Sequence, residues 1–207
     1  MATDTELLQA WRTGDRGAGN VLFKRHFNSV YRFFRNKVDE GVEDLVQRTF
    51  IACVEGRDRF RDESTLRTYL FAIAHNILKD HFRRARRTTE SLDLEQVSIV
   101  DLGASPTSVL AARDEESLVV QSLRKIPVAS QEILELFYWE QLTGAEIGQV
   151  LGVPEDTARS RLRRARQQLE STISQLQTSP ALVTSTLTTL DAWAQGMRGK
   201  FVGRAPS

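Results

Sequence analysis

Apolar residues recur every three or four positions along most of the chain, and no run alternates apolar with polar residues as a half-buried strand would. The pattern predicts an all-α protein. Its first part is expected to hold four helices. Thr3 and Glu6 would cap the first, which runs to Trp11, the second carries an apolar stripe from Phe23 to Val38, and two more cover residues 42–55 and 65–84.

The segment 88–112 loses this period and becomes rich in Ser, Thr, Gly and Pro, as interdomain linkers do. Helical spacing then returns in four further segments: Leu118 to Ile126, Ile133 to Phe137, 145–151 and 155–169. The sequence therefore predicts two small helical domains, residues 1–87 and 113–176, joined by a flexible acidic linker.

Residues 177–207 form a C-terminal extension in which Thr, Ser and Ala are frequent. Apolar residues there still share one helical face, namely Val183, Leu187, Leu190, Ala194, Met197 and Phe201. Two interpretations stay open: a short helix docked on its own domain, and an appended interaction or autoinhibitory helix.

Composition narrows the class of protein. Of the 207 residues, 41% are apolar, which is more than a disordered chain contains, yet no apolar run approaches the ~20 residues of a membrane-spanning helix. The single cysteine, Cys53, has no partner for an internal disulfide, and the N-terminus lacks the layout of a secretory signal. We expect a soluble, cytoplasmic protein without a membrane partner.

The net charge of +1 conceals a segregation of charge along the chain. Residues 1–87 carry 17 basic and 12 acidic side chains, whereas residues 88–112 carry four acids and neither Lys nor Arg. A polyanionic partner responds to local clusters of charge, so the balanced total does not argue against nucleic-acid binding.

The segment from Thr143 to Leu169 has the features of a helix-turn-helix. Thr143 is suited to cap a helix, Gly148 permits close approach of a second helix, and Gly152 supplies the turn. The second helix would present a basic face to the DNA major groove, and the alternative is a solvated basic helix without a DNA partner. The candidate residues are Asp156, Arg159, Ser160, Arg161, Arg163, Arg164 and Gln167.

A second basic cluster lies on the helix expected over residues 65–84 and just beyond it. Cations, an amide and aromatic rings on one face are the groups that hold single-stranded or melting DNA. The candidates here are Phe71, His75, Asn76, Lys79, Arg83 and Arg86. Phe71 and Phe82 are equally compatible with packing in the core. Asp80 precedes Arg84 by four residues and is expected to pair with it.

The helix expected over residues 42–55 places Ile51 on a polar face together with Asp44, Gln47 and Arg48. An exposed aliphatic residue among polar groups indicates a surface on which another protein docks.

Taken together, these segments make the sequence resemble the extracytoplasmic-function (ECF) class of bacterial sigma-70 type sigma factors. The resemblance covers about residues 5–175 and consists of three blocks in the expected order. They are VEDLVQRTF, similar to region 2.2; LRTYLFAIAHNILKDHFRR, similar to regions 2.3 and 2.4; and LTGAEIGQVLGVPEDTARSRLRRAR, similar to region 4.2.

The resemblance implies a protein that directs core RNA polymerase to promoters and helps to open them. Its partners would be core polymerase, through the β′ clamp helices and the β flap, and promoter DNA, both duplex and melted. An anti-sigma factor or a kinase is a further candidate partner. In this family the acidic linker follows the path of nascent RNA.

The resemblance also assigns residues to these surfaces. Asp44, Leu45 and Gln47 fall at polymerase-contacting positions, beside Arg48 and Ile51. Arg59 and Arg61 lie in the loop, residues 59–65, that holds a flipped-out base. The residues from Phe71 to Arg86 given above would read the −10 element, and those from Asp156 to Gln167 the −35 element.

One departure from the family pattern is Arg48, where an acid is usual. A cation there should weaken docking on a basic clamp surface. Phosphate on the adjacent Thr49 would add negative charge, so one hypothesis is that polymerase binding depends on such a modification or on a partner. The alternative is that Thr49 faces the core and Arg48 is tolerated.

No enzyme constellation is present: His26, His75 and His81 are scattered, and no Cys or His spacing suits zinc. We therefore expect a protein that is not an enzyme and needs neither cofactor nor metal. Two competing functions stay open. One is a helix-turn-helix regulator that acts without polymerase, and the other is an inactive sigma relative that serves as an anti-sigma decoy.

Overall fold

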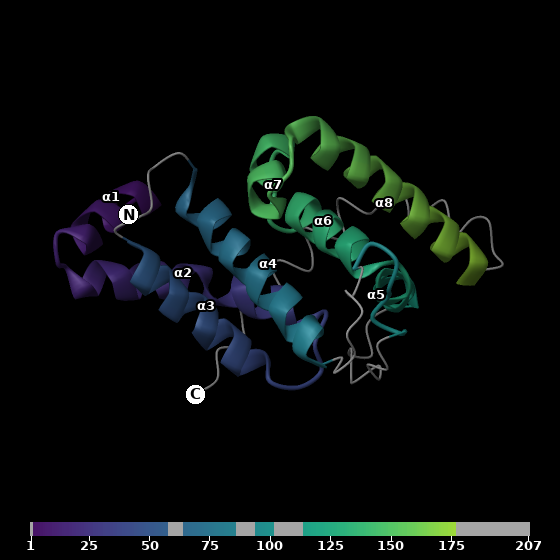
Figure 1. Ribbon diagram of the computed structural model, residues 1–207, viewed down its shortest axis with the longest axis horizontal. Coiled ribbons are helices and arrows are strands. Elements are labelled where there is room, and N and C mark those ends of the chain that lie inside the picture. Colours follow the sequence, from purple (N-terminus) through teal and green to yellow (C-terminus); the bar gives the residue numbers. More distant parts are fainter. Residues whose placement is uncertain (1, 58–63, 86–93, 102–113, 177–207) are drawn as a thin grey trace.

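The computed structural model describes residues 2–57, 64–85, 94–101 and 114–176. These residues form eight helices, labelled in Figure 1: α1 Asp4–Arg12, α2 Arg16–Arg35, α3 Val42–Gly56, α4 Leu66–Ala85, α5 Asp114–Lys125, α6 Val128–Tyr138, α7 Gly144–Leu151 and α8 Glu155–Leu176. The prediction of an all-α protein is confirmed for the described part of the chain. No helix in it is long and apolar enough to cross a membrane. The extension 177–207 lies outside the described residues.

The expected caps define the ends of two helices. Thr3 accepts a hydrogen bond from the Glu6 backbone N–H, and the Glu6 carboxylate accepts one from the Thr3 N–H at 2.7 Å, so α1 begins with a capping box. Thr143 and Glu146 make the same reciprocal pair at the start of α7. Local sequence signals therefore fix where both helices begin.

A first core lies where α1, α2, α3 and α4 meet. Its buried residues include Trp11, Leu22, Cys53 and Leu70, and the ring of Trp11 stands edge-on to that of Phe23, with centroids 5.2 Å apart. Burial of aromatic and aliphatic side chains is the main stabilising contribution here. This core orients α3 and α4, the two helices of the first half that carry candidate binding residues.

The helix-turn-helix of the second half is closed by glycines. Gly152 has a φ of +66°, which a residue without a Cβ adopts at little cost, and it ends α7. At Gly148 a Cβ would lie 2.8 Å from the carbonyl oxygen of Val153, so α7 approaches the turn too closely for any side chain. The predicted roles of both glycines are confirmed.

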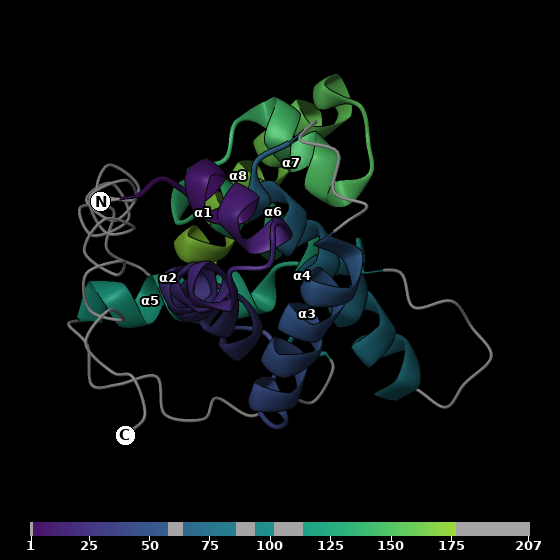
Figure 2. The ribbon, with the colours of Figure 1, turned by 90° about the vertical axis from the view of Figure 1, so that its left-hand side faces the viewer.

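The two halves of the chain pack against each other along α4 and α7, with α2 near α6 (Figures 1 and 2). One continuous core contains Phe34 and Phe71 from the first half and Leu134 and Ile147 from the second. In this structure the two helical halves are therefore in contact and are not held apart by a tether. Apolar side chains of α4 share this core with those of α6 and α7, whereas independent domains would leave them to solvent.

Part of the expected linker also belongs to this core. In the segment 94–101, the carbonyl of Val97 accepts from the Val128 N–H at 2.9 Å, and that of Leu94 accepts from the Ala129 N–H at 3.0 Å. Ile99 is fully buried. These contacts fix residues 94–101 against α5 and α6, so the described part of the linker is not a flexible tether. Its remaining residues lie outside the described ranges.

Candidate polymerase and nucleic-acid interfaces

The exposed face of α3 is the candidate polymerase-binding surface. Asp44 and Gln47 are exposed, and 47% of Ile51 is accessible to solvent. Val54, one turn further along, is 41% exposed. It was not among the predicted contacts, although its spacing of three residues from Ile51 places it on the same face of the helix. Two neighbouring aliphatic side chains in water, flanked by polar groups, are suited to contact with another protein.

Two residues that the sequence associated with this face do not reach it. Leu45 is buried, so in this structure its side chain does not lie on the exposed face where a polymerase contact is expected. Thr49 is also buried, and its hydroxyl donates to the carbonyl of Leu45 at 2.8 Å. Helical geometry turns both side chains toward the core. The burial of Thr49 agrees with the alternative stated for it, namely that Thr49 faces the core and is not presented to a kinase in this structure.

Arg48 lies between the core and the exposed face. Its guanidinium is 3.8 Å from the Asp44 carboxylate, one helical turn away. Such partly exposed pairs contribute little to stability, but they do reduce the negative charge that Asp44 presents. The cation that departs from the family pattern therefore offsets the charge of a neighbouring candidate contact.

The candidate residues of the −10 surface on α4 include exposed side chains and side chains that pair with an acidic residue. Asn76, Lys79 and Arg83 are exposed. Arg83 pairs with Asp80 at 2.9 Å, so Asp80 is held by this arginine, whereas the sequence favoured Arg84. His75 is half-buried, and its Nδ1 lies 2.8 Å from a carboxylate oxygen of Glu132.

The aromatic residues of α4 pack in the core, not on the surface. Phe71 is 1% exposed and stands edge-on to Phe33, with ring centroids 5.6 Å apart. Phe82 is buried as well. This packing favours the alternative stated for both rings, namely that they are core residues and not exposed for stacking on a base. Arg59, Arg61 and Arg86 lie outside the described residues.

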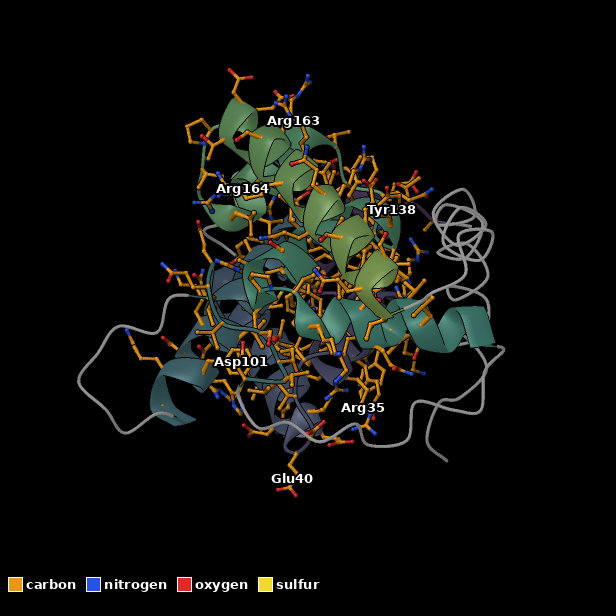
Figure 3. The ribbon with its side chains drawn as sticks, turned by 90° about the vertical axis from the view of Figure 1, so that its right-hand side faces the viewer. Arg35, Glu40, Asp101, Tyr138, Arg163 and Arg164 are labelled. Carbon is orange, nitrogen blue, oxygen red and sulfur yellow. The ribbon has the colours of Figure 1, made fainter. Side chains whose placement is uncertain are left out.

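The candidate −35 surface is the outward face of α8. Its expected apolar stripe of Ala158, Leu162, Ala165 and Leu169 is buried. Most of the candidate contacts are exposed, namely Asp156, Arg159, Ser160, Arg163, Arg164 and Gln167. Figure 3 shows Arg163 and Arg164 on the outside of this helix. The helix-turn-helix prediction and the division of α8 into two faces are confirmed.

Two arginines of α8 are engaged by acids. Arg159 pairs with Glu155 one turn earlier at 2.5 Å, a pair within the helix. Arg161 pairs at 2.5 Å with Glu95, which belongs to the linker segment 94–101. Glu95 thus contacts the helix that is the candidate reader of duplex DNA.

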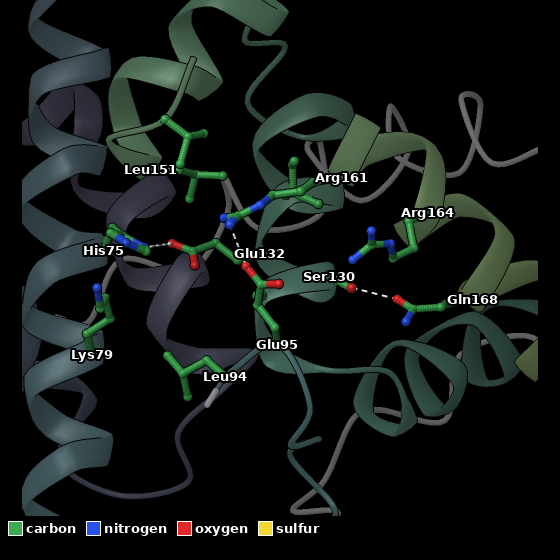
Figure 4. A pocket seen from close by; sticks show the side chains of 13 residues that line it. His75, Lys79, Leu94, Glu95, Ser130, Glu132, Leu151, Arg161, Arg164 and Gln168 are labelled. Carbon is green, nitrogen blue, oxygen red and sulfur yellow. Dashed lines mark hydrogen bonds and ion pairs between the residues drawn. The ribbon is translucent and has the colours of Figure 1, made fainter. Parts of the chain in front are cut away.

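A cavity of about 420 Å³ lies between the two candidate DNA surfaces. His75 and Lys79 of α4 line one side, and Arg161 and Arg164 of α8 line the other (Figure 4). The dashed contacts in Figure 4 join His75 to Glu132, Arg161 to Glu95 and Ser130 to Gln168. These cations could be identified from the sequence, but the proximity of α4 and α8 could not be predicted from it.

The described residues hold no group of His, Cys, Asp and Glu side chains that could bind a metal ion. Burial raises the pKa of the Cys53 thiol to about 12, so this cysteine stays protonated and unreactive at neutral pH. The chemistry of these surfaces is that of charge and hydrogen bonding.

The sequence matches two family models, Sigma-70 region 2 over residues 22–88 and Sigma-70 region 4 over residues 117–169. The ECF RNA polymerase sigma factor SigM of Mycobacterium tuberculosis is 30% identical over 179 residues, 85% of this chain and 87% of the relative. The ECF RNA polymerase sigma-E factor of Haemophilus influenzae is 28% identical over 183 residues, 84% and 97% of the two chains.

Two solved structures are similar as well. CnrH in complex with the cytosolic domain of CnrY aligns with a TM-score of 0.60 and 25% identity, over 83% of this chain and 97% of that one. The sigma factor RpoE in complex with the anti-sigma factor NepR from Bartonella quintana has a TM-score of 0.54 at 21% identity, over 74% and 93% of the chains, a likeness in fold alone. Given the relatives and the two matched regions, the chain belongs to the ECF sigma factors of the sigma-70 family, which are not enzymes and direct RNA polymerase to initiate transcription.

Proposed function

We propose that this sigma factor divides its task between the surfaces described above. The exposed face of α3 docks on the β′ clamp helices, and region 4 also meets the β flap. The polar side chains of α4 capture melted bases of the −10 element, and α8 enters the major groove at the −35 element. The observation that carries the proposal is the exposed basic face of α8, which is the second helix of a helix-turn-helix.

Energetically, neither DNA surface needs to bind tightly alone. Contacts with exposed bases offset the few kcal/mol that unpairing and unstacking a base requires. Both surfaces are carried by one polymerase-bound molecule, so the second contact forms at high effective concentration. Modest affinities at two sites are therefore enough for a stable promoter complex.

The test is run-off transcription with purified core polymerase and the variant Lys79→Ala/Arg83→Ala. We expect the yield from a duplex promoter to fall at least about tenfold, because two charge-assisted contacts to melted DNA are removed. A template with a pre-melted bubble should recover part of the yield. The control is Lys24→Ala/Lys125→Ala, which removes two exposed cations outside the proposed surfaces.

The same assay distinguishes the proposal from the alternative that the protein is an anti-sigma decoy. If it were a decoy, the wild-type chain itself would give no run-off product. Equal activity of the Lys79 and Arg83 variant and its control would remove α4 from the proposal.

For α8 we expect a weaker salt dependence of promoter binding in Arg163→Ala/Arg164→Ala. The slope of log affinity against log salt is negative, and it should become shallower by about 0.9 for each phosphate-binding cation removed, up to about 1.8 for this double variant, because fewer counterions are released. Titrating holoenzyme with duplex promoter at several salt concentrations measures the slope. An unchanged slope would show that neither arginine neutralises a phosphate.

For α3 we expect Arg48→Glu to bind core polymerase more tightly than the wild-type chain. The change restores an acid where the family usually has one and frees Asp44 from its cation. Arg48→Gln separates the two effects, since it removes the cation without adding an acid. Core titration with a fluorescent sigma factor measures affinity. An unchanged affinity of Arg48→Glu would contradict the docking role of this face, and a weaker complex would contradict the argument from charge.

We also infer that an anti-sigma protein binds this chain. Relatives in solved complexes support this, among them the sigma factor bound to NepR, an anti-sigma factor. The aliphatic pair Ile51 and Val54 is a surface that such a protein could cover. A competition assay between core polymerase and the candidate anti-sigma protein tests whether both use α3.

A further inference from the structure

The outward arginines of α8 differ in how they are held. Arg159 is anchored by Glu155, one turn earlier, whose carboxylate oxygen Oε1 accepts from its Nε at 2.9 Å and from its Nη2 at 2.5 Å. Arg163 and Arg164 are exposed, and within the described part of the chain no acidic side chain pairs with either of them. Of these three arginines, only Arg159 therefore has its direction fixed before DNA binds.

Arg159 also lies against the start of α7, in space that Gly144 leaves open. A Cβ at position 144 would be 3.1 Å from Cγ of Arg159, 3.2 Å from its Nε and 3.5 Å from Oε1 of Glu155. The first two distances are shorter than ordinary van der Waals contacts, so a side chain at this position would displace Arg159. Arg159 is thus held on two sides, although 67% of its side chain is accessible to solvent.

The contact with Glu155 leaves one edge of the guanidinium free. An arginine side chain presents its N–H donors in a rigid planar fork. Glu155 occupies the edge formed by Nε and Nη2, so the edge formed by Nη1 and the second N–H of Nη2 remains available. Two parallel N–H groups of this kind match the O6 and N7 acceptors of guanine in the major groove, the commonest base-specific contact of arginine.

The same carboxylate makes Arg159 less suited to bind a phosphate. It offsets the charge of the guanidinium, and a carboxylate near the DNA backbone is repelled by it. In a contact with guanine this repulsion matters less, because O6 and N7 are uncharged acceptors. Fixing the long side chain beforehand also reduces the conformational entropy that is lost on binding. Arg159 therefore has the properties of a base reader, and Arg163 and Arg164 have those of phosphate contacts.

We propose that Glu155 is a positioning residue that holds Arg159 for the recognition of a guanine in the −35 element, while Arg163 and Arg164 neutralise phosphates. This inference rests on the proposed function of α8 and deepens it, because it names the arginine that reads a base and the base that is read. Arg159 lies in the first turns of α8, the part of a recognition helix that contacts base edges. Glu155 was not among the predicted contacts, because an acid that acts through a neighbouring side chain has no signature in the sequence.

The experiment selects DNA by its sequence. Holoenzyme assembled from core polymerase and the full chain is mixed with promoter duplexes whose −35 region is randomised, and the bound duplexes are sequenced. The wild-type chain should enrich guanine at a position where Arg159→Ala abolishes the enrichment. Glu155→Ala should lower the enrichment at that same position by at least about fivefold, the smaller end of what a bidentate contact contributes, and should leave the other positions unchanged.

The double variant Glu155→Ala/Arg159→Ala separates an effect through Arg159 from an effect on the fold of α8. If Glu155 acts through Arg159, the double variant should discriminate between bases as well as Arg159→Ala alone, because the two changes are then not additive. A further loss in the double variant, or unchanged guanine enrichment in Glu155→Ala, would overturn the inference. A wild-type holoenzyme that enriches no −35 sequence would instead count against the proposed function of α8, so the two failures are distinguishable.

Two further variants test the role of the carboxylate itself. Glu155→Gln keeps an oxygen acceptor at the same reach, so it should retain more of the guanine preference than Glu155→Ala does. Glu170→Ala removes an exposed acid of α8 that lies outside the proposed surfaces, and it should leave the enrichment unchanged. Equal losses of guanine preference in Glu155→Gln and Glu155→Ala, with equal falls in melting temperature, would show that Glu155 only stabilises the start of α8 through the helix dipole.

Discussion

Replacing Glu135 with Leu is expected to lower the free energy of unfolding by about 3–5 kcal/mol, because the change leaves a buried ammonium group without its counter-ion. In the wild-type structure Lys37 contacts Glu135, donates to the carbonyl of Phe33 at 2.8 Å and lies 3.9 Å from the centroid of the Phe33 ring. The carbonyl and the ring do not neutralise a full charge. Urea denaturation followed by circular dichroism and tryptophan fluorescence measures the change in stability.

The double variant Lys37→Met/Glu135→Leu is the matched control. It removes both charges and fills the space with apolar atoms, so it should recover most of the stability that Glu135→Leu loses. The single variant can also avoid burying the unpaired charge if the two halves separate, because Lys37 then reaches water. In that case helix content persists while the radius of gyration grows. Equal instability of the single and double variants would show that the charge of Lys37 is not the cause.

The positions of the helices could be predicted because short-range chemistry sets them. Thr3 with Glu6 at the start of α1, Thr143 at the start of α7 and Gly152 at its end are local signals, and the structure has each where the sequence indicated. The basic face of α8 follows from its 3.6-residue period in the same way. Each of these predictions needed only neighbours within one or two turns.

Three buried carboxylates of the second half could not be predicted in this manner. Glu132, Glu135 and Glu140 read as ordinary solvated residues of a helix and its end, because their partners lie about 60 to 110 positions earlier in the chain. Their burial depends on how the halves dock, which no local pattern records. The burial of Phe71 has the same origin in part, since its core continues into the second half.

The linker departed from prediction in part, for a related reason. Its content of Ser, Thr, Gly and Pro predicted a flexible tether. Composition is an average over the whole segment and does not reveal a short part that packs. Within it, Leu94, Val97 and Ile99 are closely spaced apolar residues, and Ser98 forms an isolated β-bridge with Pro127. These apolar positions were the available signal that residues 94–101 dock on the second half.

Replacing Gly148 with Ala is expected to destabilise the helix-turn-helix by about 1–3 kcal/mol, the usual effect of overpacking a rigid contact. The new methyl group would lie 2.8 Å from the backbone oxygen of Val153, closer than carbon and oxygen approach in folded proteins. That oxygen belongs to the turn and cannot move without displacing the start of α8. Holoenzyme binding to a duplex −35 element should therefore weaken by at least about tenfold, since misplacing one side chain that reads a base costs about 1–3 kcal/mol.

Gly144→Ala is the matched control for this prediction. It is the same substitution in the same helix, but its methyl group meets the side chain of Arg159 at 3.1 Å, and that long chain can rotate away. The control should keep the melting temperature. Because Arg159 belongs to the candidate −35 surface, any loss of duplex affinity in this variant should not exceed the contribution of that one side chain. Because both variants gain the higher helix propensity of Ala, a difference between them isolates the contact with Val153. Equal DNA affinity of the two variants would mean that the spacing between α7 and α8 is not what positions the recognition face.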